Sequence, residues 1–259
     1  MKQRLMVAAA VVVILGAIGM YSFRSAGQQP APQAQRLQIN IVDVKPDMID
    51  AWIDRQAKQT VPALIKGGVV RRDVYQAAIG HTGRFIAARP IGTNAERDSP
   101  NAIEKALGAT GAKEYFQKIR AMVADETTNV IERVPEATYD PNPEAIYKVL
   151  VLSFNHITPG RVADYVNFLK TDILPVQQKA QTKRYAVSRV IFGGDPNQIG
   201  VATWSDKFAD LDAGPAIVRV LGQDGAAKLT QKTVGIVQSV EREVYVRVDA
   251  LSIRTRPTT

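Results

Sequence analysis

The chain has 259 residues, of which 46% are hydrophobic, so it can form one large domain or two smaller ones. It contains no cysteine, which excludes disulfides, thiolate metal sites and a cysteine nucleophile. The formal net charge is +8, but no basic block with interleaved aromatic residues is present. We therefore expect a solvated basic surface and no nucleic-acid partner.

The first 27 residues carry a pattern typical of export. Lys2 and Arg4 precede an uncharged apolar run over residues 5–20, and the secretion machinery reads this order of charge and apolarity. Residues 1–27 are predicted to be a cleaved signal peptide or a membrane anchor, with residues 5–23 as the anchoring stretch in the inner membrane. Both versions place the rest of the chain in the periplasm or elsewhere outside the cytoplasmic membrane. Residues 28–36, rich in Gln, Pro and Ala, predict a flexible linker.

Residues 37–138 predict one unit of alternating strands and helices. Pro62 is expected to kink or break the first helix, because proline lacks the backbone N–H of a helical residue. Gly67 and Gly68 are expected to end it. The expected elements are a strand at 37–44, a helix from Pro46, strands at 69–78 and 84–89 around a glycine-rich turn, a helix at 99–124 and a strand at 129–134. This β-α-β-β-α-β order is that of the ferredoxin-like unit.

Residues 146–250 repeat this unit. Three positions match at a separation of 113 residues: Pro46 with Pro159, Pro62 with Pro175, and Gly80 with Gly193. Over residues 102–134, 12 of 33 positions are identical to those 114 residues further on. Gly108 and Gly222 form one such pair and are expected at a bend inside the second helical region. The predicted fold is α+β, with two tandem units whose four-stranded sheets face each other.

The element order, the duplication and the proline that ends the first helix pattern (Val61-Pro62, Leu174-Pro175) resemble those of the dimeric α+β barrel superfamily. That superfamily includes NIPSNAP-like proteins, EthD-type proteins, antibiotic-biosynthesis monooxygenases and chlorite dismutases. The resemblance covers residues 37–250 and implies a barrel formed within one chain. It specifies a fold and not a reaction.

Comparing the two copies predicts which face of each first strand is buried. One face is uniformly apolar, with Leu37 and Ile39 aligned with Leu150 and Leu152, and is expected to lie under the helices. The opposite face would then point into the barrel. Its polar residues, Asn40, Ser153 and Asn155, are candidate ligand-binding groups. The alternative is that they pair with each other or with water.

Arg133 and Arg247 occupy matching places in the last strand of each copy, on the face shared with Tyr245. Because a guanidinium group can grip a carboxylate or phosphate with two parallel hydrogen bonds, both arginines are candidate ligand anchors, with Tyr245 beside them. The alternatives are a solvated charge or a structural ion pair.

The two histidines, His81 and His156, do not align with each other, and no metal-binding spacing surrounds either. Resemblance to chlorite dismutases raises the question of haem, but no motif near either histidine carries that role over, and no cofactor is expected. Cofactor-free monooxygenases of the superfamily activate substrates with polar residues lining the barrel, a scheme that could use Trp204, Tyr245 and Asn155. The leading hypothesis is binding of a small organic ligand or a protein partner; the alternative is a small-molecule oxygenase.

Overall fold

The computed structural model describes residues 35–255. The predicted export segment and all but the last two residues of the predicted linker lie outside this range. Among residues 35–255, no helix is both long and apolar enough to cross a membrane.

The first half of the described chain contains four strands and three α-helices. The helix predicted over residues 99–124 extends only to Arg120. The strand predicted over residues 129–134 begins earlier, at Val123, where β-branched residues become frequent. The elements are β1 (Arg36–Val44), α1 (Ile49–Arg55), α2 (Val61–Lys66), β2 (Arg71–Ile79), β3 (Arg84–Ile91), α3 (Ala102–Arg120) and β4 (Val123–Arg133).

The second half repeats this order of elements. They are β5 (Val149–Ile157), α4 (Val162–Phe168), α5 (Leu174–Lys179), β6 (Arg184–Phe192), β7 (Gln198–Ser205), α6 (Ala216–Gln231) and β8 (Val237–Arg247). A two-residue strand, β9 (Ile253–Arg254), pairs with the start of β2.

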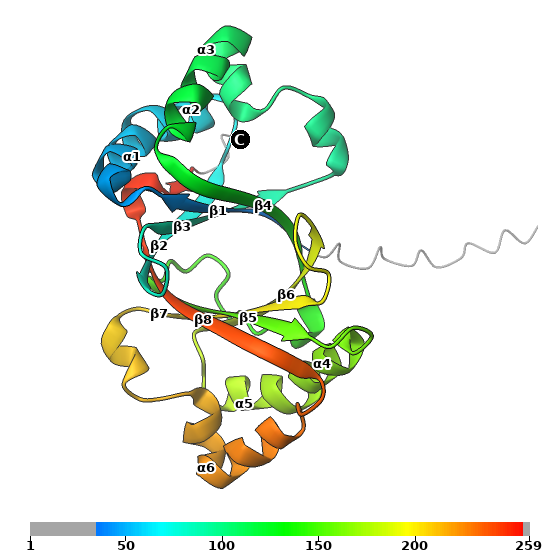
Figure 1. The fold of residues 1–259 in the computed structure, drawn as a ribbon. Coiled ribbons are helices and arrows are strands. Elements are labelled where there is room, and N and C mark those ends of the chain that lie inside the picture. Colours follow the sequence, from blue (N-terminus) through cyan, green and yellow to red (C-terminus); the bar gives the residue numbers. More distant parts are fainter. Residues whose placement is uncertain (1–34, 256–259) are drawn as a thin grey trace, which may run out of the picture. The chain divides into compact units, whose positions relative to one another are not determined.

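Eight strands form a closed antiparallel barrel in the order β2-β3-β1-β4-β6-β7-β5-β8 (Figure 1). The β4–β6 and β8–β2 pairs join the two halves and close the ring. The sheets therefore face each other as expected, but they are also hydrogen-bonded edge to edge. Closure satisfies the backbone groups of strands that would otherwise be exposed edges.

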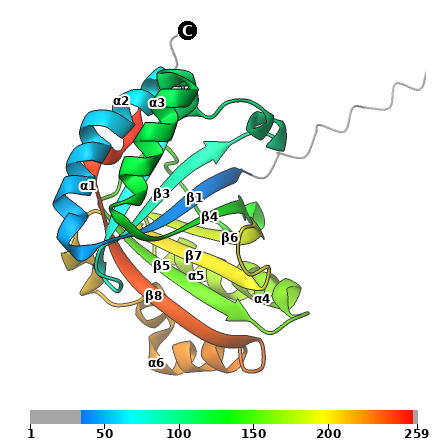
Figure 2. The same ribbon diagram turned by 45° about the horizontal axis from the view of Figure 1, so that its top comes forward.

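The helices cover the outside of the barrel. Figures 1 and 2 show α1–α3 over the strands of the first half and α4–α6 over those of the second. Trp52 of α1 packs on Phe85 of β3 in one outer core, and Tyr165 and Leu169 pack on Tyr185 in the other. Each sheet thus buries one face under helices and turns the other toward the barrel interior.

A π-helical segment interrupts the first helix of each half. Residues Gln56–Thr60 join α1 to α2, and Leu169–Ile173 join α4 to α5. The N–H of Val61 donates to Gln56, five residues back, directly before Pro62. Because Pro62 has no N–H to donate, the wider turn accommodates it and the helix continues. The helix is therefore not broken at this proline, although its regular α-helical hydrogen bonding is interrupted just before it, and α2 ends before Gly67 as predicted.

The second helix of each half bends at the paired glycines. Gly108 in α3 and Gly222 in α6 both have φ of 71°, with ψ of 169° and 177°. This combination is accessible almost only to glycine. The predicted bend is confirmed at both positions.

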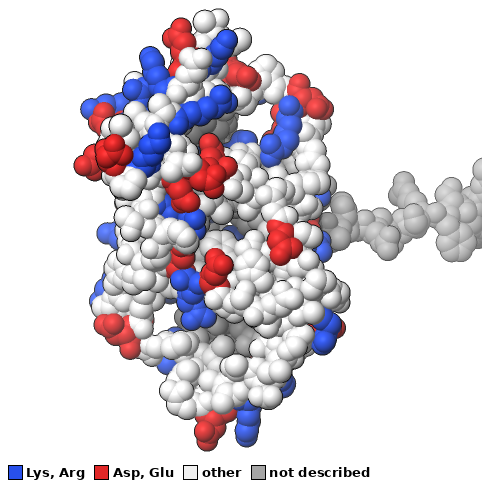
Figure 3. All heavy atoms as spheres, in the orientation of Figure 1, with Lys and Arg blue, Asp and Glu red and all other residues white. Residues whose placement is uncertain are grey.

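Charges of both signs are distributed over the face of the protein that Figure 3 shows. Lys and Arg side chains lie among Asp and Glu side chains, most densely over the helices of the first half. On this face the net positive charge forms no unbroken basic stripe.

Candidate functional site

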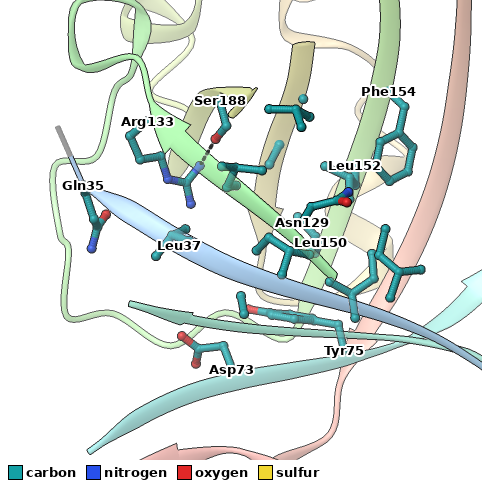
Figure 4. Close-up of a pocket in the computed structure, with 18 of the residues that line it drawn as sticks. Gln35, Leu37, Asp73, Tyr75, Asn129, Arg133, Leu150, Leu152, Phe154 and Ser188 are labelled. Atoms are coloured by element: carbon teal, nitrogen blue, oxygen red, sulfur yellow. Dashed lines mark hydrogen bonds between the residues drawn. The ribbon is translucent and has the colours of Figure 1, made fainter. Parts of the chain in front are cut away.

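A partly open cavity of about 150 Å³ with mainly apolar walls lies inside the barrel. Its lining includes Leu37 and Ile39 of β1 and Leu150, Leu152 and Phe154 of β5 (Figure 4). These residues belong to the face that the sequence places under the helices, so that predicted orientation is wrong. Strand alternation separates an apolar from a more polar face, but it does not say which of the two lies inside a barrel and which lies under helices.

The three polar residues of the opposite strand face consequently lie outside the barrel. Asn40 donates to Thr128 at 2.9 Å on the surface. Asn155 accepts a hydrogen bond from the Tyr165 hydroxyl of α4 at 3.1 Å, under the second-half helices. Ser153, on the same outer face, accepts one from Arg242 at 3.0 Å.

Tyr245 and Glu243, two residues apart on β8, lie on the inward face of the strand. Tyr245 is fully buried, and its hydroxyl donates to the carboxylate of Glu243. Glu243 also accepts from the His81 backbone N–H at 3.1 Å and lies 3.4 Å from the Arg84 guanidinium. Burial opposes ionisation of Glu243, but these hydrogen bonds outweigh it and lower the pKa of its carboxyl group. This network closes the β8–β2 seam near one end of the barrel.

Guanidinium groups gather at the opposite end of the cavity. Arg71, Arg133 and Arg184, from three different strands, all line it. Arg184 is 2.9 Å from an Asp140 carboxylate oxygen and donates to the carbonyls of residues 142 and 143. Arg71 lies 3.5 Å from the Asp73 carboxylate. Arg184 is therefore paired with an acid of its own, whereas Arg71 shares Asp73 with Arg247 and Arg254.

Arg133 lacks such a partner among residues 35–255. One of its terminal nitrogens donates to the Ser188 hydroxyl at 3.2 Å (Figure 4). Its guanidinium carbon lies 5.7 Å from the centre of the Trp204 ring, within the range of a cation–π interaction. Burial, followed by repulsion from Arg184, lowers the pKa of Arg133 to about 10, while Asp140 opposes this shift. The side chain therefore remains charged at neutral pH.

Two further polar features of the cavity come from aromatic and amide side chains. The Trp204 indole N–H donates to the Tyr75 hydroxyl at 3.2 Å, which links β7 to β2 across the interior. Asn129, on β4, also lines the cavity, and its side-chain oxygen is buried without a hydrogen-bond partner in the part of the chain that the structure describes. Such an unsatisfied acceptor can receive a hydrogen bond from a ligand.

Sequence reasoning found Arg133 but missed Asp73, Asn129 and Ser188. A usable signal existed for Arg71 and Arg184, which are 113 residues apart and therefore occupy matching positions in the two copies. Asp73 and Ser188 could not be found in this way, because neither is repeated in the other copy.

The residues of the cavity do not fit haem, which proteins most often hold through a histidine. Within residues 35–255 both histidines lie away from the cavity lining. His81 is 2.5 Å from the Glu243 carboxylate, and His156 is 3.7 Å from that of Asp195. The same range contains no group of three or more His, Asp or Glu side chains that could bind a metal ion.

No protein-family model matches the sequence, and no curated protein matches it either. Solved structures with the same fold do exist. An anthrone oxidase-like protein has a TM-score of 0.58 and 10% identity, over 84% of this chain and 92% of that protein. A proposed monooxygenase from Lactobacillus acidophilus has a TM-score of 0.54 and 10% identity, over 86% and 97%. A proposed chlorite dismutase has a TM-score of 0.50 and 11% identity, over 84% and 96%. The chain therefore shares the dimeric α+β barrel fold, as its sequence suggested.

Proposed function

We propose that this protein binds a small, mainly apolar organic molecule inside its barrel. The observation that carries the proposal is the cavity of about 150 Å³ between Leu37, Ile39, Leu150 and Leu152. An enclosed apolar cavity of similar size binds molecules such as benzene. A hollow interior favours a small ligand over a protein partner, which would require a complementary outer surface.

The proposal is tested by filling the cavity. Ala202 lies on the inner face of β7 against Tyr75 and Leu150, so Ala202→Phe places an aromatic ring inside the barrel. Binding of indole, measured by calorimetry, should fall at least about tenfold, because the added ring occupies the ligand's volume. Val240→Phe adds the same ring at an exposed position of β8 and should leave binding unchanged. Equal indole affinity in both variants would count against a ligand site in the barrel.

Oxygenase chemistry on a bound ligand is the second candidate. Trp204 lines the cavity and is hydrogen-bonded to Tyr75, whereas Tyr245 and Asn155 are engaged elsewhere in the fold. The test is dioxygen uptake with anthrone, where one oxygen atom enters the product ketone and the other leaves as water. Trp204→Phe removes the hydrogen bond to Tyr75 and should reduce that uptake at least about tenfold if this bond keeps the Tyr75 hydroxyl aimed at the substrate. No uptake by the unaltered protein would refute this candidate.

We further propose that the two halves are tandem ferredoxin-like units of common origin. Their matching element order supports this, as do the π segments before Pro62 and Pro175 and the bends at Gly108 and Gly222.

Export across the cytoplasmic membrane, by cleaved signal or anchor, is also proposed. It is supported by Lys2, Arg4 and the apolar run that follows. Alkaline phosphatase fused after residue 36 should be active in a bacterial host, and an inactive fusion would argue against export.

A further inference from the structure

The duplication places one arginine at each seam where the two halves join. Arg133 of β4 faces Ser188 across the β4–β6 seam, and Arg247 of β8 faces Tyr75 across the β8–β2 seam. The two arginines are 114 residues apart, the separation that relates the last strands of the two copies. They are therefore equivalent positions, and one serves as an internal reference for the other.

Arg247 is paired with two acidic side chains. It donates to the carboxylate of Asp73 across the seam, and its Nε donates to Asp249 at 2.8 Å. Only 4% of its side chain is exposed. Burial disfavours its charge, but the bond with Asp73 outweighs this effect and raises the pKa of Arg247 above its usual value. In the β8–β2 seam the arginine is thus one member of a structural ion pair.

Both acids are absent from the equivalent places around Arg133. The residue matching Asp73, 113 positions later, is Ala186, and the residue matching Asp249, 114 positions earlier, is Pro135. The strand register supports the first match, because Asp73 pairs with Ala88 of β3 and Ala186 pairs with Ala202 of β7. The same guanidinium therefore occurs at both seams, with its counter-charges at only one.

The unmatched guanidinium is available to a ligand in the cavity. The Arg133 guanidinium has five N–H donors. Within residues 35–255, one of them donates to the neutral Ser188 hydroxyl. The guanidinium carbon lies over the Trp204 ring, 5.7 Å from the ring centre. A guanidinium fork matches the two oxygens of a carboxylate, whose single negative charge would pair with the positive charge of Arg133. A phosphate monoester carries more charge than this one group would neutralise.

We propose that Arg133 binds the carboxylate of an organic acid whose apolar body lies between Leu37 and Leu150. The inference rests on the proposed function, since it identifies the chemical class of the ligand that the cavity takes. In this protein, the position occupied by Asp73 in one half is left to the ligand's own carboxylate in the other.

The test compares two probes of the same shape, 4-phenylbutyrate and 4-phenylbutan-1-ol, by calorimetry at pH 7. The unaltered protein should bind the acid at least about tenfold more tightly than the alcohol, because only the acid forms charge-assisted hydrogen bonds. Arg133→Gln should weaken acid binding about ten- to hundredfold and change alcohol binding by less than about twofold. Ala186→Asp supplies the missing carboxylate from the protein itself and should cause the same selective loss.

Arg189→Gln is the matched control. Arg189 lies on the outer face of β6 with 58% of its side chain exposed, paired with Glu132, so its replacement should alter neither affinity. Equal binding of acid and alcohol by the unaltered protein would overturn the carboxylate assignment and leave cavity binding intact. Binding of neither probe would overturn both proposals. An acid preference that survives in Arg133→Gln would also overturn the assignment, and this variant decides the matter if Ala186→Asp does not fold.

Discussion

Asp73 is the residue on which the ionic structure of the β8–β2 seam depends. It accepts hydrogen bonds from Arg247 of β8 and Arg254 of β9, and it lies 3.5 Å from Arg71 of its own strand. Burial of Asp73 opposes its ionisation, but the bond from Arg247 and the charges of Arg254, Arg247 and Arg71 outweigh it. The pKa of Asp73 is therefore lowered from its usual value of 3.8.

We predict that Asp73→Asn destabilises the protein by about 3 kcal/mol at pH 7, because it leaves Arg247 buried with a weakened counter-charge. The pKa of Asp73 is lower in the folded than in the unfolded chain. Its stabilising contribution is thus complete well above pH 4 and is lost as the pH falls through the folded-state value. The free-energy difference between the two proteins should shrink below about pH 4. Urea unfolding at a series of pH values measures it.

Asp164→Asn is the control for this prediction. Asp164 forms an ion pair with Arg161, but both side chains are about half exposed, so its loss should cost less than about 1 kcal/mol. Similar losses in the two variants would show that Asp73 is no more important than a surface pair. A difference that persists unchanged at pH 3 would show that the Asp73 carboxylate charge is not the cause.

At the scale of elements, the bent second helices depend on a backbone conformation and not on a side-chain contact. A Cβ atom added to Gly108 or Gly222 would meet nothing within 4 Å. The requirement for glycine therefore comes from φ of 71° alone. This explains why the glycine is retained in both halves although neither residue lies in the cavity lining.

We predict that Gly108→Ala and Gly222→Ala each destabilise the protein by about 1–3 kcal/mol, the usual cost of a non-glycine residue in such a conformation. Thermal unfolding measures the loss. Gly111→Ala is the matched control in the same helix. The new Cβ would meet only the Leu107 Cβ at 3.2 Å, and the stability change should stay within about 1 kcal/mol. Equal effects at Gly108 and Gly111 would contradict the backbone explanation.

At the scale of the whole described structure, the two halves complete each other's sheet. The β4–β6 and β8–β2 pairs join strands from different halves, and Trp204 of one half is hydrogen-bonded to Tyr75 of the other. Separating the halves would expose four strand edges and the apolar interior to water. Neither half is expected to keep its structure once the other unfolds.

We therefore predict a single cooperative unfolding transition. The chain has two tryptophans, Trp52 on the buried face of α1 in the first half and Trp204 in the second-half wall of the cavity. Fluorescence of Trp52→Phe and Trp204→Phe thus reports each half separately. In each variant the fluorescence and circular-dichroism midpoints in urea should coincide, and the calorimetric and van't Hoff enthalpies should agree. Two separate transitions would mean that the halves fold as independent units.

The sequence alone determined the repeated order of elements. Hydrophobic periodicity and the positions of proline and glycine are local signals, and they recur at an offset of 113–114 residues. It also identified Arg133 and Arg247 as equivalent. Tertiary structure decided which face of each strand is interior, since alternation separates the two faces of a strand but does not say which of them the helices cover. It also decided which arginine has acidic partners, because Asp73 and Arg247 are 174 residues apart and meet only through closure of the barrel. The cavity and its unpaired charge are therefore properties of the closed barrel, formed from strands that no local pattern brings together.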